Sequence, residues 1–232
     1  MTRLFSSFAL IALFAGQPVT AEQRAVVVEL YTSQGCSSCP PADAMFKELS
    51  NRDDVIAIAL HVDYWDYIGW KDAFGNPAHS ARQRAYAHAG RRNTIYTPEI
   101  IVNGQTDIVG AKPMALSKAI AEHKVQKRQA SLTVARSGGN LRIAVAADTV
   151  LKGPFDIHVL GLTPTATTQI TRGENRGKTI DYSNIAHSWA IVGEWDGTSA
   201  MSLDVAAPKD DPAVVLIQHA GAGPIIAAAR VD

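Results

Sequence analysis

The sequence predicts a layered α/β domain over residues 22–128, followed by a smaller all-β, sandwich-like domain over residues 129–232. Strand-like and helix-like segments alternate in the first part, whereas short strand-like runs separated by turns make up the second. The chain has 232 residues, of which 47% are hydrophobic and 19% charged, so it has ordinary globular composition. This length is enough to bury a core in each part.

The first 21 residues are typical of a secretion signal. Arg3 gives a basic start, residues 4–15 form an almost unbroken apolar run, and residues 19–21 (VTA) are small. We therefore expect residues 1–21 to be a signal peptide that is cleaved before Glu22. The alternative is a membrane anchor, but the run is shorter than the ~20 apolar residues that a span needs. The sequence predicts export to the periplasm, where disulfides persist.

The charge balance gives no sign of a polyanionic partner. Twenty-two basic residues balance 22 acidic ones, and removing Arg3 with the signal leaves 21 against 22, a net charge of −1. Such a balance creates no field that would gather nucleic acid or a membrane surface. We therefore expect no nucleic-acid partner and no membrane association after signal cleavage. As a separate expectation, the sequence gives no sign of a cofactor.

Hydrophobic periodicity predicts the elements of the first domain. A β-branched apolar run at 25–31 suits a central strand, and the apolar spacing of residues 42–49 predicts a helix. The remaining elements are a buried strand (55–62), a polar helix (77–89), a strand ended by an Asn-Gly turn (99–102) and a helix with Pro at its start (113–124).

The second domain is predicted from short, partly alternating runs between Gly, Asn or Pro turns. The clearest hairpin turn is the Ser-Gly-Gly-Asn segment at 137–140. The predicted strands lie at 131–135, 141–147, 155–162, 185–192, 201–205 and 214–218.

The two cysteines, Cys36 and Cys39, are the strongest chemical signal in the sequence. A disulfide between residues so close restricts the unfolded chain little, by about 2 kcal/mol against about 4.7 for a hundred-residue loop. The pair follows a strand and precedes a helix, which favours a reactive thiolate. The prolines at 40 and 41 suit the first turn of that helix, so the helix can start nearer Cys39 and act less on Cys36. The acidity of Cys36 stays open.

Two other interpretations of the cysteine pair remain. Two thiolates at this spacing can hold cuprous copper or zinc, but a closed zinc site needs four ligands. His61, at the end of a strand, is the best candidate for a third ligand, and it can equally be a polar residue at a strand end. The pair can also be an inert disulfide.

Two segments resemble the active site of thioredoxin-like oxidoreductases. Residues 28–40 (VELYTSQGCSSCP) are similar to the active-site strand and loop of that superfamily, and residues 96–104 (YTPEIIVNG) to its cis-proline loop, strand and turn. The resemblance implies a thioredoxin-like fold for the first domain.

The same resemblance implies roles for five residues. Cys36 would be the nucleophile, Cys39 would resolve the mixed disulfide, and Pro98, in a cis bond after Thr97, would lie against the pair and bind an extended substrate. Glu29 matches a buried acid that could carry the proton of Cys39, with a raised pKa caused by burial; the alternative is that it reaches solvent at the strand end.

A narrower resemblance covers nearly the whole mature chain. Residues 62–72 (VDYWDYIGWKD) and 172–177 (RGENRG) are similar to a secreted thioredoxin-like family labelled as domain of unknown function 1223. It implies the architecture but no substrate or partner. The residues inside the cysteine motif, Ser37 and Ser38, and the preceding Gly35 differ from those of thioredoxin, which leaves the direction of electron flow open.

Two further segments are candidates for binding. Five aromatic residues crowd positions 64–74; Tyr64, Trp65 and Trp70 would grip a protein substrate, or the rings would pack the second domain onto the first. The polar loop at 172–178 would recognise an anion, reach across to the cysteines, or simply be solvated.

These observations favour an exported thiol–disulfide oxidoreductase that acts on protein thiols and disulfides outside the cytoplasm, together with a redox partner protein. The alternatives are a module that binds copper or zinc through both thiolates, and a non-catalytic binding protein on a thioredoxin scaffold.

Overall fold

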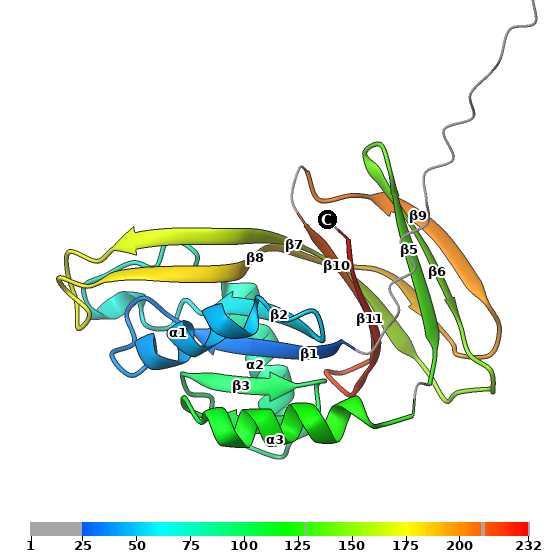
Figure 1. Ribbon diagram of the computed structural model, residues 1–232, viewed down its shortest axis with the longest axis horizontal. Helices are drawn as coiled ribbons and strands as arrows, with labels where there is room; N and C mark the ends of the chain where they lie inside the picture. The colour runs from blue at the N-terminus through cyan, green and yellow to red at the C-terminus, as the bar shows by residue number, and fades with distance from the viewer. Residues whose placement is uncertain (1–24, 128, 210–211, 232) are drawn as a thin grey trace, which may run out of the picture.

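The computed structural model describes residues 25–127, 129–209 and 212–231. The expected signal peptide lies outside these residues. The described chain is a mixed α/β structure with a large, mostly β core (Figure 1). None of the described helices is long and apolar enough to cross a membrane.

The first part alternates strands and helices, as the periodicity predicted. Helices α2 and α3 begin and end at the predicted residues, each with proline in its first turn, and α1 begins two residues earlier than predicted. The elements are β1 (Val26–Thr32), α1 (Pro40–Leu49), β2 (Val55–His61), the short 3₁₀ helix η1 (Asp66–Ile68), α2 (Pro77–Ala89), β3 (Glu99–Val102), β4 (Thr106–Val109) and α3 (Pro113–Lys124).

The described elements after α3 are all strands. Two of them are much longer than predicted, with 15 residues in β7 and 17 in β8, and the last strand was not predicted. The strands are β5 (Ser131–Ser137), β6 (Asn140–Ala146), β7 (Phe155–Gln169), β8 (Thr179–Trp195), β9 (Met201–Ala206), β10 (Ala213–His219) and β11 (Ile225–Val231).

Strands from both parts share one sheet. Its eight strands lie in the order β11-β10-β7-β8-β2-β1-β3-β4, and β8 joins β2 through the parallel pair Ala59 and Ile185. A second sheet contains β5, β6 and β9. The boundary expected at residue 128 therefore separates two kinds of sequence, while the hydrogen-bonded sheet continues across it.

Three buried clusters hold the layers together. One lies between the sheet and helices α1 and α3, and includes Val28, Phe46 and Ile120. The second lies on the opposite face with α2, and the third joins the three-stranded sheet to β7, β10 and β11. Consecutive residues of β1 therefore face different helices, because side chains alternate along a strand.

The ends of β7 and β8 form a long hairpin that reaches past β2 toward α1 (Figure 1). The hairpin therefore brings β8 into contact with helix α1, which follows the cysteine pair.

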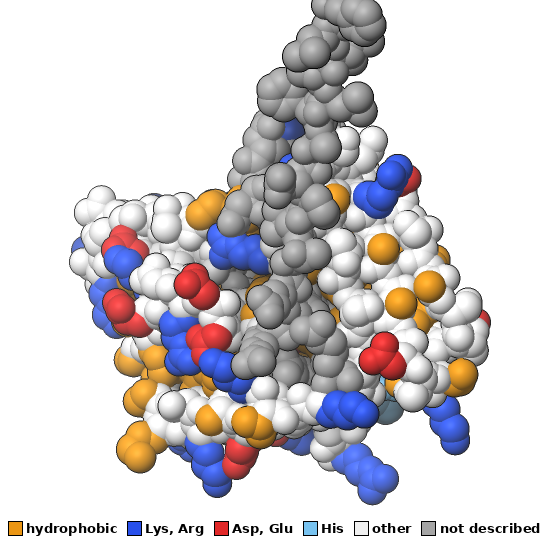
Figure 2. Space-filling view, turned by 45° about the vertical axis from the view of Figure 1, so that its right-hand side comes forward, with side chains coloured by type: hydrophobic (Ala, Val, Ile, Leu, Met, Phe, Trp, Pro, Cys, Tyr) orange, Lys and Arg blue, Asp and Glu red, His pale blue; other side chains and the backbone are white. Residues whose placement is uncertain are grey.

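On the face shown in Figure 2, basic and acidic side chains are scattered among each other rather than gathered into one patch.

Candidate redox site

Cys36 and Cys39 form a disulfide between the end of β1 and the start of α1. The S–S distance is 2.06 Å, and Cys39 is the N-cap residue of the helix. Cys36 is 2% exposed and Cys39 0%, whereas Ser37 and Ser38 between them are exposed. The bond is thus buried while the two serines of the same loop are exposed, and Ser38 Oγ lies 3.4 Å from Cys36 Sγ.

The loop before β3 lies beside this disulfide. The Thr97–Pro98 peptide bond is cis, as predicted, and Pro98 is buried. Ser38 Oγ donates to the carbonyl oxygen of Thr97 at 3.4 Å. The structure therefore brings Thr97 and Pro98 together with the cysteine pair, although they are about sixty residues away in the sequence.

Two tryptophans of the aromatic segment donate hydrogen bonds to the loops that form this site. Trp65 Nε1 donates to Thr97 Oγ1 at 2.7 Å, and Trp70 Nε1 donates to Gln34 Oε1 at 2.8 Å. The ring of Tyr67 is stacked on Trp65 at 6.4 Å and is 79% exposed. Two indoles thus hold the cysteine loop and the Thr97 loop in place, and one exposed ring lies next to them.

The other aromatic side chains of the segment have structural contacts. Tyr64 donates its hydroxyl to Gln83 Oε1 in α2 at 3.1 Å. Phe74 packs edge-on against Tyr182 of β8, with 6.0 Å between ring centroids. The packing interpretation therefore fits Phe74, whose ring contacts Tyr182 in the second half of the chain.

The tip of the β7–β8 hairpin binds the cysteine loop directly. Asn175 is buried, and its Nδ2 donates to the carbonyl oxygens of Gln34 at 2.9 Å and Cys36 at 2.8 Å. Lys178 Nζ donates to Asn175 Oδ1 at 2.8 Å. Of the three interpretations of the polar loop, these bonds fit the one in which it reaches across to the cysteines, and the commoner case of a solvated turn does not hold for Asn175.

Gly173 allows the hairpin tip to approach this closely. Its φ is +72°, and an added Cβ would lie 3.1 Å from Cβ of Trp70. A side chain would therefore meet both an unfavourable backbone conformation and a steric conflict.

Sequence reasoning missed a buried carboxyl group one helical turn after Cys39. Asp43 lies on α1 four residues from Cys39, so the two side chains are neighbours on one helix face. Thr32 Oγ1 donates to Asp43 Oδ1 at 2.7 Å, and Asp43 Oδ2 has no hydrogen-bond partner among the described residues. Burial raises the pKa of Asp43 to about 7. The i, i+4 spacing from Cys39 was the signal that could have found it.

A buried histidine and aspartate lie behind the same loop. His61 Nδ1 is 2.7 Å from Asp72 Oδ2, which also accepts from the amide of Gln34 at 2.8 Å. Burial acts to raise the pKa of Asp72, but hydrogen bonds from His61 and from the amides of Gln34 and Phe74 outweigh it and lower the pKa.

His61 was the expected third ligand in the metal interpretation. The structure pairs its Nδ1 with Asp72 instead, and its Nε2 has no hydrogen-bond partner in the described part of the chain. Within residues 25–127, 129–209 and 212–231, no group of three or more His, Cys, Asp or Glu is arranged to hold a metal ion.

Glu29 lies on the other face of the sheet from α1. It is buried, with its Oε1 2.7 Å from Arg82 Nε, and its Oε2 accepts from the hydroxyl of Tyr86 at 2.6 Å. Its neighbours on the strand show why: Val28 belongs to the cluster beneath α1, whereas Val27 belongs to the cluster with α2. The alternative in which Glu29 reaches solvent is wrong, because its side chain is buried. The ion pair with Arg82 also stabilises the ionised carboxylate, which makes Glu29 less suited to take up a proton from Cys39.

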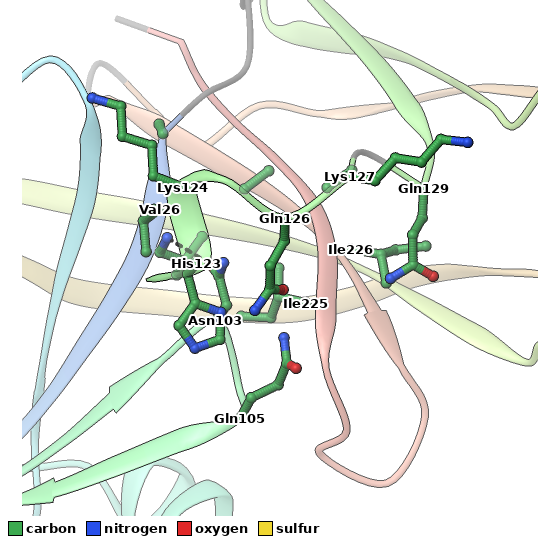
Figure 3. A pocket seen from close by; sticks show the side chains of 14 residues that line it. Val26, Asn103, Gln105, His123, Lys124, Gln126, Lys127, Gln129, Ile225 and Ile226 are labelled. Carbon is green, nitrogen blue, oxygen red and sulfur yellow. Dashed lines mark hydrogen bonds between the residues drawn. The ribbon is translucent and has the colours of Figure 1, made fainter. Parts of the chain in front are cut away.

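A cavity of about 360 Å³ lies away from the cysteines. Residues from the end of α3, the turn after β3 and β11 surround it (Figure 3). Val26 and Val27 also line it, so it lies at the opposite end of β1 from the disulfide. It is therefore not part of the site around the cysteines.

Comparisons with known proteins place the chain among uncharacterised relatives. A family model described as "Protein of unknown function (DUF1223)" matches residues 27–218. A crystal structure of a protein from Agrobacterium tumefaciens is 30% identical, with a TM-score of 0.77, and the match covers 90% of this chain and 95% of that one. HBP35 of Porphyromonas gingivalis shares the fold at 14% identity, with a TM-score of 0.63 and coverage of 89% and 74%. None of the curated proteins compared with the chain matches it.

Proposed function

We propose that this chain, which belongs to the DUF1223 family, is a thioredoxin-like thiol–disulfide oxidoreductase that acts on proteins in the periplasm. The observation that carries the proposal is the Cys36–Cys39 disulfide at the junction of β1 and α1, with the Thr97–Pro98 loop against it. A cysteine pair placed at the start of a helix and beside a second loop is arranged for exchange with another chain rather than for closing a long loop.

Exchange with a partner disulfide proceeds in two steps. In the reduced protein the Cys36 thiolate attacks one sulfur of the partner, a mixed disulfide forms, and the first partner sulfur leaves as a thiolate that takes a proton from water. The Cys39 thiol then loses its proton and attacks Cys36 Sγ, which breaks the mixed disulfide and releases the second partner sulfur. The partner disulfide is reduced to two thiols, and the pair Cys36–Cys39 is oxidised.

The second step needs a proton acceptor near Cys39, and Asp43 fits this role better than Glu29. Asp43 is one helical turn from Cys39, is buried and has an oxygen without a hydrogen-bond partner among the described residues. Burial raises its pKa to about 7, so it can take up a proton near neutral pH. Glu29 faces α2 and is paired with Arg82.

A second candidate function follows from the burial of the disulfide. With 2% exposure of Cys36 and 0% of Cys39, the bond is covered in the oxidised chain. A binding protein with an inert disulfide would have this property. In the oxidoreductase, a partner must displace Ser38, whose side chain is exposed and contacts Cys36 Sγ.

Reduction of insulin by the chain, in the presence of a dithiol, tests the proposal. We expect wild type to accelerate the reaction, Cys36→Ser to lose the acceleration, and Cys39→Ser to accumulate a mixed disulfide with its substrate. Ser37→Ala is the matched control, because it alters an exposed residue of the same loop and should keep most activity. Wild-type activity equal to that of Cys36→Ser would instead favour the inert disulfide.

A further inference from the structure

The start of α1 offers few free donors to a thiolate at Cys36. Pro40 and Pro41 occupy the first turn and have no N–H group. The next two amides, of Ala42 and Asp43, both donate to the carbonyl oxygen of Cys39, at 2.8 and 3.1 Å. The helix N-terminus therefore supplies few free N–H groups to a thiolate at Cys36, and Ser38 Oγ, 3.4 Å from Cys36 Sγ, is one donor from outside the helix.

The hairpin tip supplies donors on the other side of the loop. The carbonyl oxygen of Cys36 accepts from the amide of Cys39 at 3.2 Å and from Asn175 Nδ2 at 2.8 Å. These donors offset the partial negative charge that this carbonyl would otherwise present next to a thiolate on the same residue. Asn175 also binds the carbonyl of Gln34, so its amide plane is fixed relative to the loop.

Lys178 places a full positive charge behind this amide. Its Nζ donates to Asn175 Oδ1 at 2.8 Å, so the ammonium group, the amide and the Cys36 carbonyl form a hydrogen-bonded chain. Asn175 is fully buried, and hydrogen bonds in a low-dielectric interior polarise one another. Lys178 itself is exposed, and the buried Asn175 amide connects its charge to the cysteine loop.

We propose that Asn175 and Lys178 are positioning residues that hold the Cys36 loop and stabilise the Cys36 thiolate of the reduced protein. This inference rests on the proposed function and deepens it, because it makes the β7–β8 hairpin part of the redox site. The hairpin and the cysteine loop are separated by about 140 residues of sequence, as the contact between Cys36 and Asn175 shows.

Other charged groups face the same region from different elements. Asp72, on the loop after β2, accepts a hydrogen bond from the Gln34 amide. Its carboxylate disfavours a second negative charge, such as a Cys36 thiolate, in the same loop. Asp43 of α1, with His61 of β2 close enough to lower its pKa, lies on the Cys39 side. The described hydrogen bonds connect the cation of Lys178 to Cys36 through Asn175. Removing this cation should therefore make the Cys36 thiolate less stable.

Alkylation of the reduced chain by iodoacetamide across a pH series tests this inference without any protein substrate. The rate reports the fraction of Cys36 present as thiolate. For Lys178→Met we expect the midpoint of the profile to rise by on the order of half a pH unit, which means roughly threefold slower alkylation below the midpoint. Asn175→Ala should shift it further in the same direction, and Lys178→Arg should restore the wild-type profile.

Lys47→Met is the matched control. Like Lys178→Met, this variant removes one lysine cation. Lys47, however, forms an exposed ion pair with Asp181 of β8 at 2.8 Å and has no part in the hydrogen bonds to the Cys36 carbonyl. Its profile should equal that of wild type. Equal midpoints for Lys178→Met and Lys47→Met would overturn this inference, even if the wild-type chain reduces insulin. If the wild-type chain does not reduce insulin, the proposed function is overturned instead.

Discussion

Two buried carboxyl groups on opposite faces of the sheet have very different surroundings. Glu29 on β1 has an arginine at 2.7 Å and a tyrosine hydroxyl at 2.6 Å. Asp43 on α1 has one threonine hydroxyl at 2.7 Å and an oxygen with no partner in the described residues. Both are buried, so burial alone does not decide what a carboxyl group does.

The partners of each carboxyl group indicate whether it is held in a structural network or is free to exchange a proton. Arg82 also binds Tyr86 and Gln218, so the Glu29 network joins α2, β1 and β10. Asp43 has no cation at hydrogen-bond distance among the described residues, and burial raises its pKa to about 7. Under the proposed function, Glu29 therefore contributes to stability and Asp43 to proton transfer, and the following predictions test this division.

Arg82→Met should have the largest effect on stability. It leaves Glu29 buried without its cation, and breaking a buried pair from one side costs about 3–5 kcal/mol. Urea unfolding measures the loss. The fraction that stays folded should reduce insulin at the wild-type rate; loss of specific activity in folded protein would connect Glu29 to the chemistry and break the comparison.

Asp43→Asn should raise stability and lower activity. The folded pKa of about 7 lies above the ordinary value of 3.8, so between pH 4 and 7 the folded chain keeps a proton that the unfolded chain has lost. Stability of wild type therefore falls as pH rises through this window, by about 1.4 kcal/mol per unit, and on the order of 3–4 kcal/mol in total.

The variant should lack this slope, because asparagine does not titrate. Denaturant unfolding at several pH values, compared between wild type and variant, measures it. Asp43→Asn should also accumulate mixed disulfide with substrate. Parallel pH profiles for the two proteins would contradict the assignment of Asp43.

Tyr86→Phe and Thr32→Val form a matched pair, since each removes one hydroxyl donor from a buried carboxyl group. Tyr86→Phe should cost about 1–3 kcal/mol of stability, because an oxygen of Glu29 loses its donor, and should leave the pH profile of exchange unchanged. Thr32→Val should shift that profile upward, because the Thr32 hydroxyl lowers the pKa of Asp43. A shift in the tyrosine variant rather than the threonine variant would reverse the two roles.

Lys47→Met should have the smallest effect. The ion pair with Asp181 is half exposed at both side chains, so water and salt screen it and it adds little to stability. Thermal unfolding should place this variant close to wild type. A loss comparable with that of Arg82→Met would mean that this surface pair, rather than Asn175, contributes most to holding the hairpin against the first half of the chain.

Local sequence signals predicted most of the helices and strands. Proline at the first helical position fixed the starts of α2 and α3, and the Asn-Gly pair at 103–104 predicted the turn after β3. The extension of β7 was missed because residues 163–169 are rich in threonine and largely exposed, so they lack an alternating apolar pattern. The start of β8 pairs with this segment along backbone hydrogen bonds that hydropathy does not report.

The candidate site was predictable only in part. The cysteines and the cis bond at Pro98 came from motifs, but the face on which Glu29 lies depends on which helices cover the sheet, and strand alternation gives only relative faces. Asn175 was named only as one residue of a polar loop, because its two carbonyl acceptors are brought to it by tertiary contacts.

The reduction potential of the Cys36–Cys39 couple tests the central claim most directly. Equilibration of the chain with defined ratios of oxidised and reduced glutathione or dithiothreitol, followed by trapping of free thiols, gives the value. An exchanging pair should lie between about −270 and −120 mV, the range of oxidoreductases from thioredoxin to strong oxidants. A value below about −300 mV, typical of structural disulfides, would contradict the account.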